Sequence, residues 1–498
     1  MLAVFLAALS AGAIALFLAR GELLHFGDAA AHINIARRVL DSRTPGWEQI
    51  GTVWLPLPHV LMLPLVGYDQ LWRSGVAGSI PSGACFVLAG VLLFLAARRV
   101  FGSNAAAAAA ALLLALNPNL LYMQAIPMTE ALFLACLAGV LYFTVRFQEE
   151  QSWGSLVGAA AFCLAGALTR YEGWFLIPFV TGFFLVSARR RRVLAACVFG
   201  AITSLGPLYW LWHNYYFHGN ALEFYSGIFS AKAIYQRALA HGEARYPGDG
   251  DWRTAARYVG TAIRLCAGWP LAALAIAGAA LSVLRRRALW PLLLLLLPPV
   301  FYIWSVYSGG TPIFLPWLWP FSYYNARYGI AALPLLALAA AGVVAVCPER
   351  WRRGAATLAV LAAISPWLGY PRAESWVCWK ESQVNSVARR SWTRQAAEYF
   401  RANYRRGDGI LTSSGDLPAI FQQAGIHLKE TLADYNRIPW RETIRGVRPV
   451  REKWVVAISG SEVAQVLERT RRTGPRYDLV KRIAESGAPA IEIYRRNE

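Results

Sequence analysis

Asp28 and His32 open the first strongly polar stretch of the sequence, directly after an apolar run over residues 2–19. Four residues apart, they share one face of a helix. A carboxylate at the end of a membrane-length run predicts a catalytic group that deprotonates or orients an acceptor hydroxyl at the membrane surface, with His32 beside it. The alternative is structural, because an aspartate that follows Gly27 and precedes an alanine-rich stretch is typical of a helix N-cap. An Asp/His pair without further ligands is weak evidence for a metal, and we assign no metal ligands.

Glu130 is a second carboxylate in an apolar setting, within the sequence Pro127-Met-Thr-Glu130 and about one turn inside a later apolar run. A charge at that depth is costly unless it faces the protein interior. Two interpretations stay open. Glu130 is either a second acidic group of the catalytic site, together with Asp28, or half of a structural ion pair.

Two arginines stand at the ends of apolar runs, each followed by a tyrosine. They are Arg170, with Tyr171, and Arg327, with Tyr328. The planar guanidinium group matches phosphate oxygens, so these four residues predict a phosphate-binding surface. The alternative is that the arginines extend to lipid headgroups from the membrane edge. Lys232 is a further candidate for phosphate, because arginine supplies most of the other positive charge.

The composition identifies the scaffold that positions these groups as a membrane protein. Of the 498 residues, 56% are hydrophobic and 16% charged, well below the quarter expected of a soluble domain. The net charge of +20 comes from short arginine clusters between apolar runs, as in cytoplasmic loops, which argues against a nucleic-acid-binding protein. The seven cysteines show no metal-binding or disulfide spacing.

The apolar runs predict about eleven transmembrane helices, which we assign to residues 2–19, 75–97, 104–118, 128–147, 155–168, 174–186, 193–212, 269–284, 289–307, 328–347 and 355–369. Arginine clusters at 98–99, 189–192, 285–287 and 350–353 place the intervening turns in the cytoplasm. The N-terminus is then cytoplasmic and the C-terminus extracytoplasmic. Loops 21–68, 213–268 and 308–327 lie on the exterior face, and residues 54–66 form a helix along the membrane surface.

The composition changes near residue 371, which divides the chain into a transmembrane module over 1–370 and a small extracytoplasmic α/β domain over 371–498. In the second part the apolar runs shorten to strand length. We predict strands over 409–412, 454–458, 479–483 and 490–494, and helices over 392–404, 417–424 and 462–469.

The chain resembles the GT-C superfamily of integral-membrane glycosyltransferases, and most of all the bacterial relatives of protein O-mannosyltransferases and lipid A aminoarabinose transferase. The resemblance covers roughly residues 1–370. It is carried by Gly27-Asp28-Ala-Ala-Ala-His32 after the first span, Met128-Thr-Glu130, Leu168-Thr-Arg-Tyr-Glu-Gly-Trp174 and Ala326-Arg-Tyr328. The paired Asp-Glu motif of the eukaryotic O-mannosyltransferases is absent, because Ala29 follows Asp28.

The resemblance implies a polyprenyl-phosphate-sugar-dependent glycosyltransferase, a hexosyl- or pentosyltransferase, of the bacterial inner membrane. Its donor is a polyprenyl-phosphate monosaccharide, and its acceptor is a lipid, a glycan or a protein on the extracytoplasmic face. Asp28 corresponds to the family's catalytic acidic residue, and inversion at the anomeric carbon is expected. No cofactor is indicated, and a divalent metal is left open. The alternatives are a transporter or flippase of lipid-linked sugars, and an inactive assembly or sensor protein on the same scaffold.

Overall fold

The computed structural model describes residues 1–284, 289–473 and 475–497, which fall into two compact units. The helical unit comprises residues 1–17, 52–58 and 80–381, and the mixed unit comprises residues 18–51, 59–79 and 382–498. The segment that carries Asp28 thus groups with the C-terminal region. The division at residue 371 stays a prediction. Each unit is described by itself.

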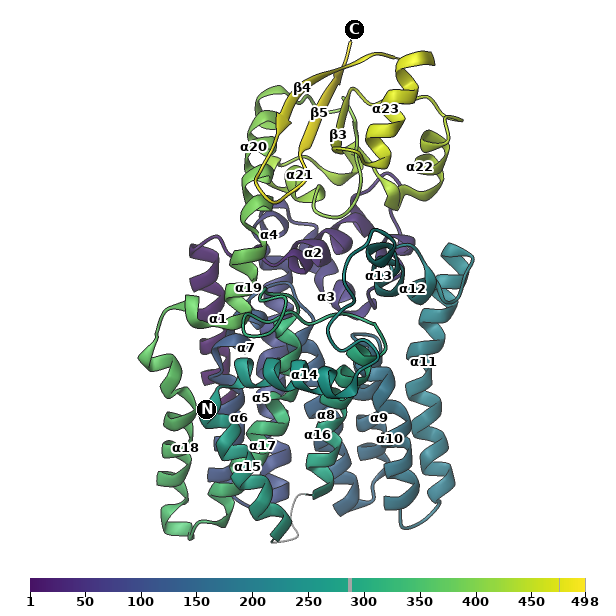
Figure 1. Cartoon of the computed structure of the whole chain (residues 1–498). Helices are drawn as coiled ribbons and strands as arrows, with labels where there is room; N and C mark the ends of the chain where they lie inside the picture. The colour runs from purple at the N-terminus through teal and green to yellow at the C-terminus, as the bar shows by residue number, and fades with distance from the viewer. Residues whose placement is uncertain (285–288, 474, 498) are drawn as a thin grey trace. The chain divides into compact units, whose positions relative to one another are not determined.

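The helical unit is built mainly of helices that run side by side, with α14 lying across them (Figure 1). They are α1 (Leu2–Ala19), α5 (Val76–Phe101), α6 (Asn104–Ala115), α7 (Pro118–Ala125), α8 (Glu130–Glu150), α9 (Trp153–Ala167), α10 (Tyr171–Ser187), α11 (Arg192–His218), α14 (Trp252–Ala267), α15 (Trp269–Leu284), α16 (Leu289–Tyr307), α17 (Leu333–Val346) and α18 (Glu349–Gly369). Shorter helices α12 (Glu223–Ser226), α13 (Ala231–Ala240) and α19 (Val377–Asn385) connect or follow them. All eleven predicted spans are therefore largely helical. The observed ends differ from the predicted ones by up to six residues, at the end of α11 and the start of α18, and the span 104–118 is interrupted between α6 and α7.

The apolar helices identify an integral membrane protein. Within the described ranges, six helical segments are long and apolar enough to cross a membrane on their own, and up to eight if bent pairs count as single spans. These pairs are α6 with α7, bent by 63°, and α14 with α15, bent by 108°. The count of eleven crossings stays a prediction. The cluster at 285–287, which contributed to the predicted orientation, lies outside the described residues.

Small residues allow two of these helices to pack closely. A Cβ atom on Gly278 of α15 would lie 1.9 Å from the carbonyl oxygen of Ala339 on α17. Only glycine fits at such a contact, as is common where membrane helices approach each other. Side-chain caps define the start of other helices, as at Ser103 before α6 and Ser152 before α9.

The mixed unit contains a five-stranded sheet covered by helices on both faces (Figure 1). Its strands are β1 (Ile410–Leu411), β2 (Thr431–Leu432), β3 (Trp454–Ile458), β4 (Tyr477–Ile483) and β5 (Ile491–Arg496), in the order β2-β1-β3-β5-β4. The first three are parallel, and β5 pairs antiparallel with β3 and β4. Its helices are α2 (Gly27–Leu40), α3 (Leu57–Val66), α4 (Asp69–Ser74), α20 (Val387–Asn403), α21 (Pro418–Ala424), α22 (Arg437–Ile444) and α23 (Glu462–Thr473).

Strand β3 shows why the sheet needs two helical layers. Its side chains alternate between faces, and both faces are buried. Trp454 and Val456 pack with α20 and α21, whereas Val455 and Ala457 pack with α22 and α23. A continuous apolar run of this kind is typical of a strand covered on both sides. The predicted α/β fold is confirmed. The sequence analysis missed β2, since two residues are too short to form a pattern.

Candidate functional site

Glu130 is the first residue of α8 and is buried in the helical unit. A carboxylate in the first turn of a helix is stabilised by the helix dipole. Its Oε1 lies 3.1 Å from Arg170 Nη1 and also 3.1 Å from Arg327 Nε. Its Oε2 is buried without a hydrogen-bond partner among the described residues. The structure thus brings together three predicted site residues that are up to 197 positions apart in the chain.

Arg170 stands immediately before α10 and uses most of its donors inside the protein. Nη1 donates to Thr129 Oγ1 at 2.6 Å as well as to Glu130, Nε donates to Glu172 Oε1 at 2.7 Å, and Nη2 donates to Tyr302 Oη at 2.7 Å. The Tyr302 hydroxyl in turn donates to Glu172. Four of the five guanidinium protons are therefore engaged, so Arg170 holds this cluster together.

Tyr328 and Tyr302 form an aromatic wall beside the two arginines. Their rings stack, with centroids 4.4 Å apart. The guanidinium carbons of Arg170 and Arg327 lie 5.6 and 5.5 Å from the Tyr328 ring centroid, within the range of cation–π attraction. The cluster thus holds two guanidinium groups and two carboxylates in a largely desolvated place, where electrostatic interactions are strong.

Glu381, on α19, positions the segment that carries Arg327. Its carboxylate is buried and accepts hydrogen bonds from the backbone N–H groups of Asn325 (2.7 Å) and Ala326 (2.9 Å). Asn325 adopts the left-handed conformation, with φ of 57°, which asparagine tolerates better than most residues. Arg327 follows directly. A carboxylate bonded to two N–H groups fixes this turn and hence the start of the guanidinium side chain.

Sequence analysis missed three members or supports of this cluster. Glu172 lies in the quoted Leu168–Trp174 motif, and a buried acid at the start of an apolar helix was a usable signal. Glu381 lies in a mixed polar segment that gives no such signal. Tyr302 lies within an apolar span, where aromatic residues are common, and nothing in its neighbourhood distinguishes it.

Tyr171 and Lys232 have partners of a different kind. The Tyr171 hydroxyl donates to the carbonyl oxygen of Val53 at 2.7 Å and accepts from Trp210 Nε1 at 3.3 Å, which indicates a structural role. Lys232, on α13, is exposed, and its ammonium group contacts the hydroxyl and the ring of Tyr225. Among the described residues, neither side chain forms a hydrogen bond or ion pair with Glu130.

Asp28 lies in the first turn of α2, in the mixed unit, and is partly exposed. The N-cap position belongs to Phe26, and no side-chain capping hydrogen bond is formed. The helix-capping alternative for Asp28 is therefore wrong. The guanidinium group of Arg389 lies close to the same turn. A Cβ atom added to Gly27 would be 3.3 Å from Arg389 Nη1. Arg389 also donates to the carbonyl oxygen of His25 and lies 3.4 Å from Asp416.

His32, one turn beyond Asp28, is buried, and its Nδ1 lies 2.9 Å from Nε2 of His59. This contact favours a structural role for the His32 side chain. The remaining polar groups of α2 are also used internally. Asn34 accepts a hydrogen bond from Trp72 Nε1 and donates to Gln422 Oε1. These contacts join α2, α4 and α21. The polar side chains of α2 therefore serve largely to hold the fold together.

Within the described ranges, no group of three or more His, Cys, Asp or Glu side chains is placed to hold a metal ion. The donors that converge on Glu130 are guanidinium groups, which suit an anion rather than a cation.

Comparison with known proteins places this geometry in a wider context. The family model described as dolichyl-phosphate-mannose-protein mannosyltransferase matches residues 71–211. ArnT from Cupriavidus metallidurans bound to undecaprenyl phosphate superposes with a TM-score of 0.58 at 14% identity, covering 98% of this chain and 97% of the other. The apo form of the same protein gives 0.55 at 13% identity, with 93% of both chains covered. Comparison with curated protein sequences gave no match.

The apo oligosaccharyltransferase of Archaeoglobus fulgidus also superposes, with a TM-score of 0.50 and 14% identity over 92% of this chain and 69% of the other. The chain has a GT-C fold. The resemblance stated from sequence is confirmed. The GT-C fold extends over nearly the whole chain, including the C-terminal region that the sequence resemblance did not cover. The matched family range contains Glu130, Arg170 and Tyr171.

Proposed function

We propose that this chain is a glycosyltransferase that moves a sugar from a polyprenyl-phosphate monosaccharide to an acceptor on the extracytoplasmic face of the membrane. The observation that supports it best is the buried cluster in which Arg170 and Arg327 converge on Glu130 inside a GT-C fold. A structural neighbour with undecaprenyl phosphate bound supports a donor of the same kind. The acceptor is a lipid, a glycan or a protein.

The proposed reaction is a single displacement. The acceptor hydroxyl oxygen attacks the anomeric carbon, the bond from that carbon to the phosphate oxygen breaks, and polyprenyl phosphate leaves with the electron pair. Attack from the side opposite the leaving group inverts the configuration. Negative charge grows on the phosphate in the transition state, so a fixed cation near it lowers the barrier.

Arg327 is the stronger candidate for the phosphate. Arg170 is already committed to Glu130, Glu172 and Tyr302, and we assign it a positioning role. A phosphate that approaches Arg327 competes with Glu130 for the Arg327 guanidinium group. When Arg327 binds the phosphate, Arg170 keeps its ion pair with Glu130. Lys232 is exposed and suits the lipid phosphate at an earlier stage of binding.

Asp28 is proposed to accept the proton of the acceptor hydroxyl, or to orient that hydroxyl. Asp28 is partly exposed in the first turn of α2. Its replacement by asparagine keeps the shape of the side chain and removes a first-turn charge, which is expected to weaken the helix only slightly. The predicted orientation, with a cytoplasmic N-terminus and an extracytoplasmic C-terminal region, belongs to the same proposal.

The test is release of polyprenyl phosphate. The full chain, purified in detergent, is supplied with a panel of radiolabelled polyprenyl-phosphate monosaccharides and a membrane lipid extract as acceptor, with wild type and Asp28→Asn side by side. Release by the wild type that falls by orders of magnitude in Asp28→Asn supports the proposal. Binding of donor lipid without release, together with lipid-linked-sugar translocation in proteoliposomes, contradicts it and supports a flippase.

A further inference from the structure

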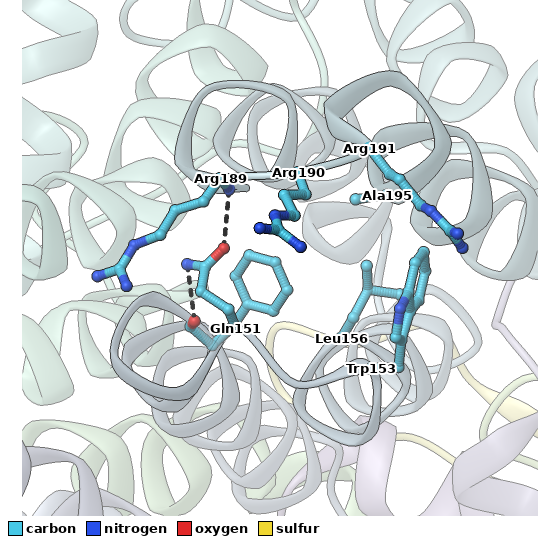
Figure 2. Close-up of a pocket in the computed structure, with 8 residues that line it drawn as sticks. Gln151, Trp153, Leu156, Arg189, Arg190, Arg191 and Ala195 are labelled. Carbon is cyan, nitrogen blue, oxygen red and sulfur yellow. Dashed lines mark hydrogen bonds between the residues drawn. The ribbon is translucent and has the colours of Figure 1, made fainter.

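A cavity of about 430 Å³ lies at the end of the helical unit where α8 ends and α11 begins (Figure 2). Its floor is apolar and consists of Phe147, Leu156 and Ala195. Trp153 stands at its rim, and the consecutive residues Arg189–Arg191 complete the wall. The apolar residues come from α8, α9 and α11, and the arginines come from the turn between α10 and α11. None of these residues belongs to the Glu130 cluster.

Gln151 holds the two turns around the cavity in place. It adopts the left-handed conformation, with φ of 51°. Its Nε2 donates to the carbonyl oxygens of Phe147 (3.1 Å) and Ser187 (3.2 Å), and its Oε1 accepts from the backbone N–H of Arg189 (2.8 Å). The arginine turn is thereby fastened to the end of α8. Figure 2 shows Arg190 pointing into the space above Gln151 and Leu156, while Arg191 runs on the side of Trp153.

Some of the arginines near this end of the helices are paired with carboxylates, and others are not. Arg99 pairs with Glu149 and with Glu150, and Arg146 also pairs with Glu150 at 2.8 Å. The two carboxylates at the end of α8 are thus used by arginines outside the cavity. Among the described residues, the guanidinium groups of Arg189–Arg191 take part in no ion pair. Three exposed cations without counter-charges therefore border a preformed hollow.

We propose that this cavity binds the phosphate headgroup of an anionic phospholipid from the surrounding membrane. Guanidinium groups match phosphate oxygens, and basic pockets between membrane helices suit anionic lipid headgroups. The apolar floor accommodates the glycerol and the first carbons of the chains, and a tryptophan at the rim suits the membrane–water boundary. A free phosphate shares the anionic chemistry but gains nothing from an apolar floor.

The proposal is tested by native mass spectrometry of the full chain in mild detergent, after delipidation and titration with phosphatidylglycerol or, separately, phosphatidylcholine. The wild type is expected to retain one phosphatidylglycerol with at least about tenfold preference, since each basic side chain near an anionic lipid contributes appreciably. The variant R189A/R190A/R191A is expected to lose this preference. R350A/R352A/R353A is the matched control, because it removes the same charge from the start of another helix, α18.

Two further measurements distinguish a lipid phosphate group from free inorganic phosphate as the bound anion. Trp153→Ala is expected to weaken phosphatidylglycerol retention, which a purely electrostatic surface would not show. Inorganic phosphate at millimolar concentration is expected to leave the bound lipid in place. Displacement of the lipid by phosphate overturns the lipid assignment, and so does equal loss of preference in the two triple variants. Thermal unfolding confirms that each variant is folded, and Arg190→Gln alone, expected to lose part of the preference, replaces the triple variant if that unfolds.

Discussion

Arg327 Nε lies 3.1 Å from Glu130 Oε1, although 197 residues separate the two in the chain. Both side chains are buried. A buried charge is tolerated when an opposite charge lies close to it, and removal of one partner leaves the other unpaired. The pair ties the start of α8 to the segment before α17.

Glu130→Gln is expected to destabilise the helical unit by about 3 kcal/mol, because Arg170 and Arg327 each lose a buried counter-charge. Thermal unfolding in detergent measures this. Glu149→Gln is the matched control. It removes one partner of an exposed ion pair with Arg99, whose loss costs at most about 1 kcal/mol. Equal shifts in the two variants would contradict the importance assigned to the buried cluster.

Arg170 and Arg327 are expected to differ when each is replaced by lysine. Arg170→Lys loses its bonds to several partners at once and is expected to lower the unfolding temperature, since a single ammonium group cannot reproduce the planar set of donors. Arg327→Lys retains a charge near the proposed phosphate and is expected chiefly to raise the KM for the lipid donor. Kinetics and thermal unfolding on both variants check this. The opposite pattern would exchange the positioning and phosphate-binding roles.

The helices of this chain were predictable because long apolar runs leave few alternatives in a membrane. The bounds of α1 and α15 agree with those expected. Convergence of Glu130, Arg170 and Arg327 was not predictable, because contacts across 40 to 197 residues depend on packing and not on local spacing. The contact of His32 with His59 was likewise not predictable, because the two residues come from different segments and the spacing of His32 from Asp28 gives no information about it.

Asp28→Asn is expected to reduce turnover by about 10²–10⁴-fold, the contribution typical of a general base, with a much smaller effect on the unfolding temperature from the charge lost in the first turn of α2. Release of polyprenyl phosphate and thermal unfolding are measured together. Asp251→Ala is an informative contrast. Asp251 does cap α14, accepting from the Arg253 N–H at 2.9 Å, so its replacement by alanine, which cannot cap, is expected to lower the unfolding temperature. Loss of stability without loss of turnover in Asp28→Asn would return that residue to a structural role.

Asn34→Ala is expected to destabilise the mixed unit by about 1–3 kcal/mol, because it leaves the buried Trp72 Nε1 and Gln422 Oε1 without their partner. Chemical or thermal unfolding measures the loss. Asn403→Ala is the control, since the side chain of Asn403 is exposed and, among the described residues, bonds only to the Tyr399 carbonyl oxygen. A shift below about 0.5 kcal/mol in Asn34→Ala, as at ordinary surface sites, would show that the network contributes little.

His25 is expected to make the mixed unit less stable as the pH falls. Burial, assisted by the charges of Arg390 and Arg389, lowers the pKa of His25 from 6.5 to about 4, although a hydrogen bond from Gln383 opposes the shift. Between these two pH values the unfolded chain binds a proton that the folded chain does not. The contribution of His25 is therefore fully present above pH 6.5 and is lost as the pH falls toward 4. His25→Asn is expected to flatten the pH dependence of the unfolding temperature in that interval, whereas His241→Asn, at an exposed histidine, is expected to leave it unchanged. An unaltered profile in His25→Asn would show that other groups cause the acid sensitivity.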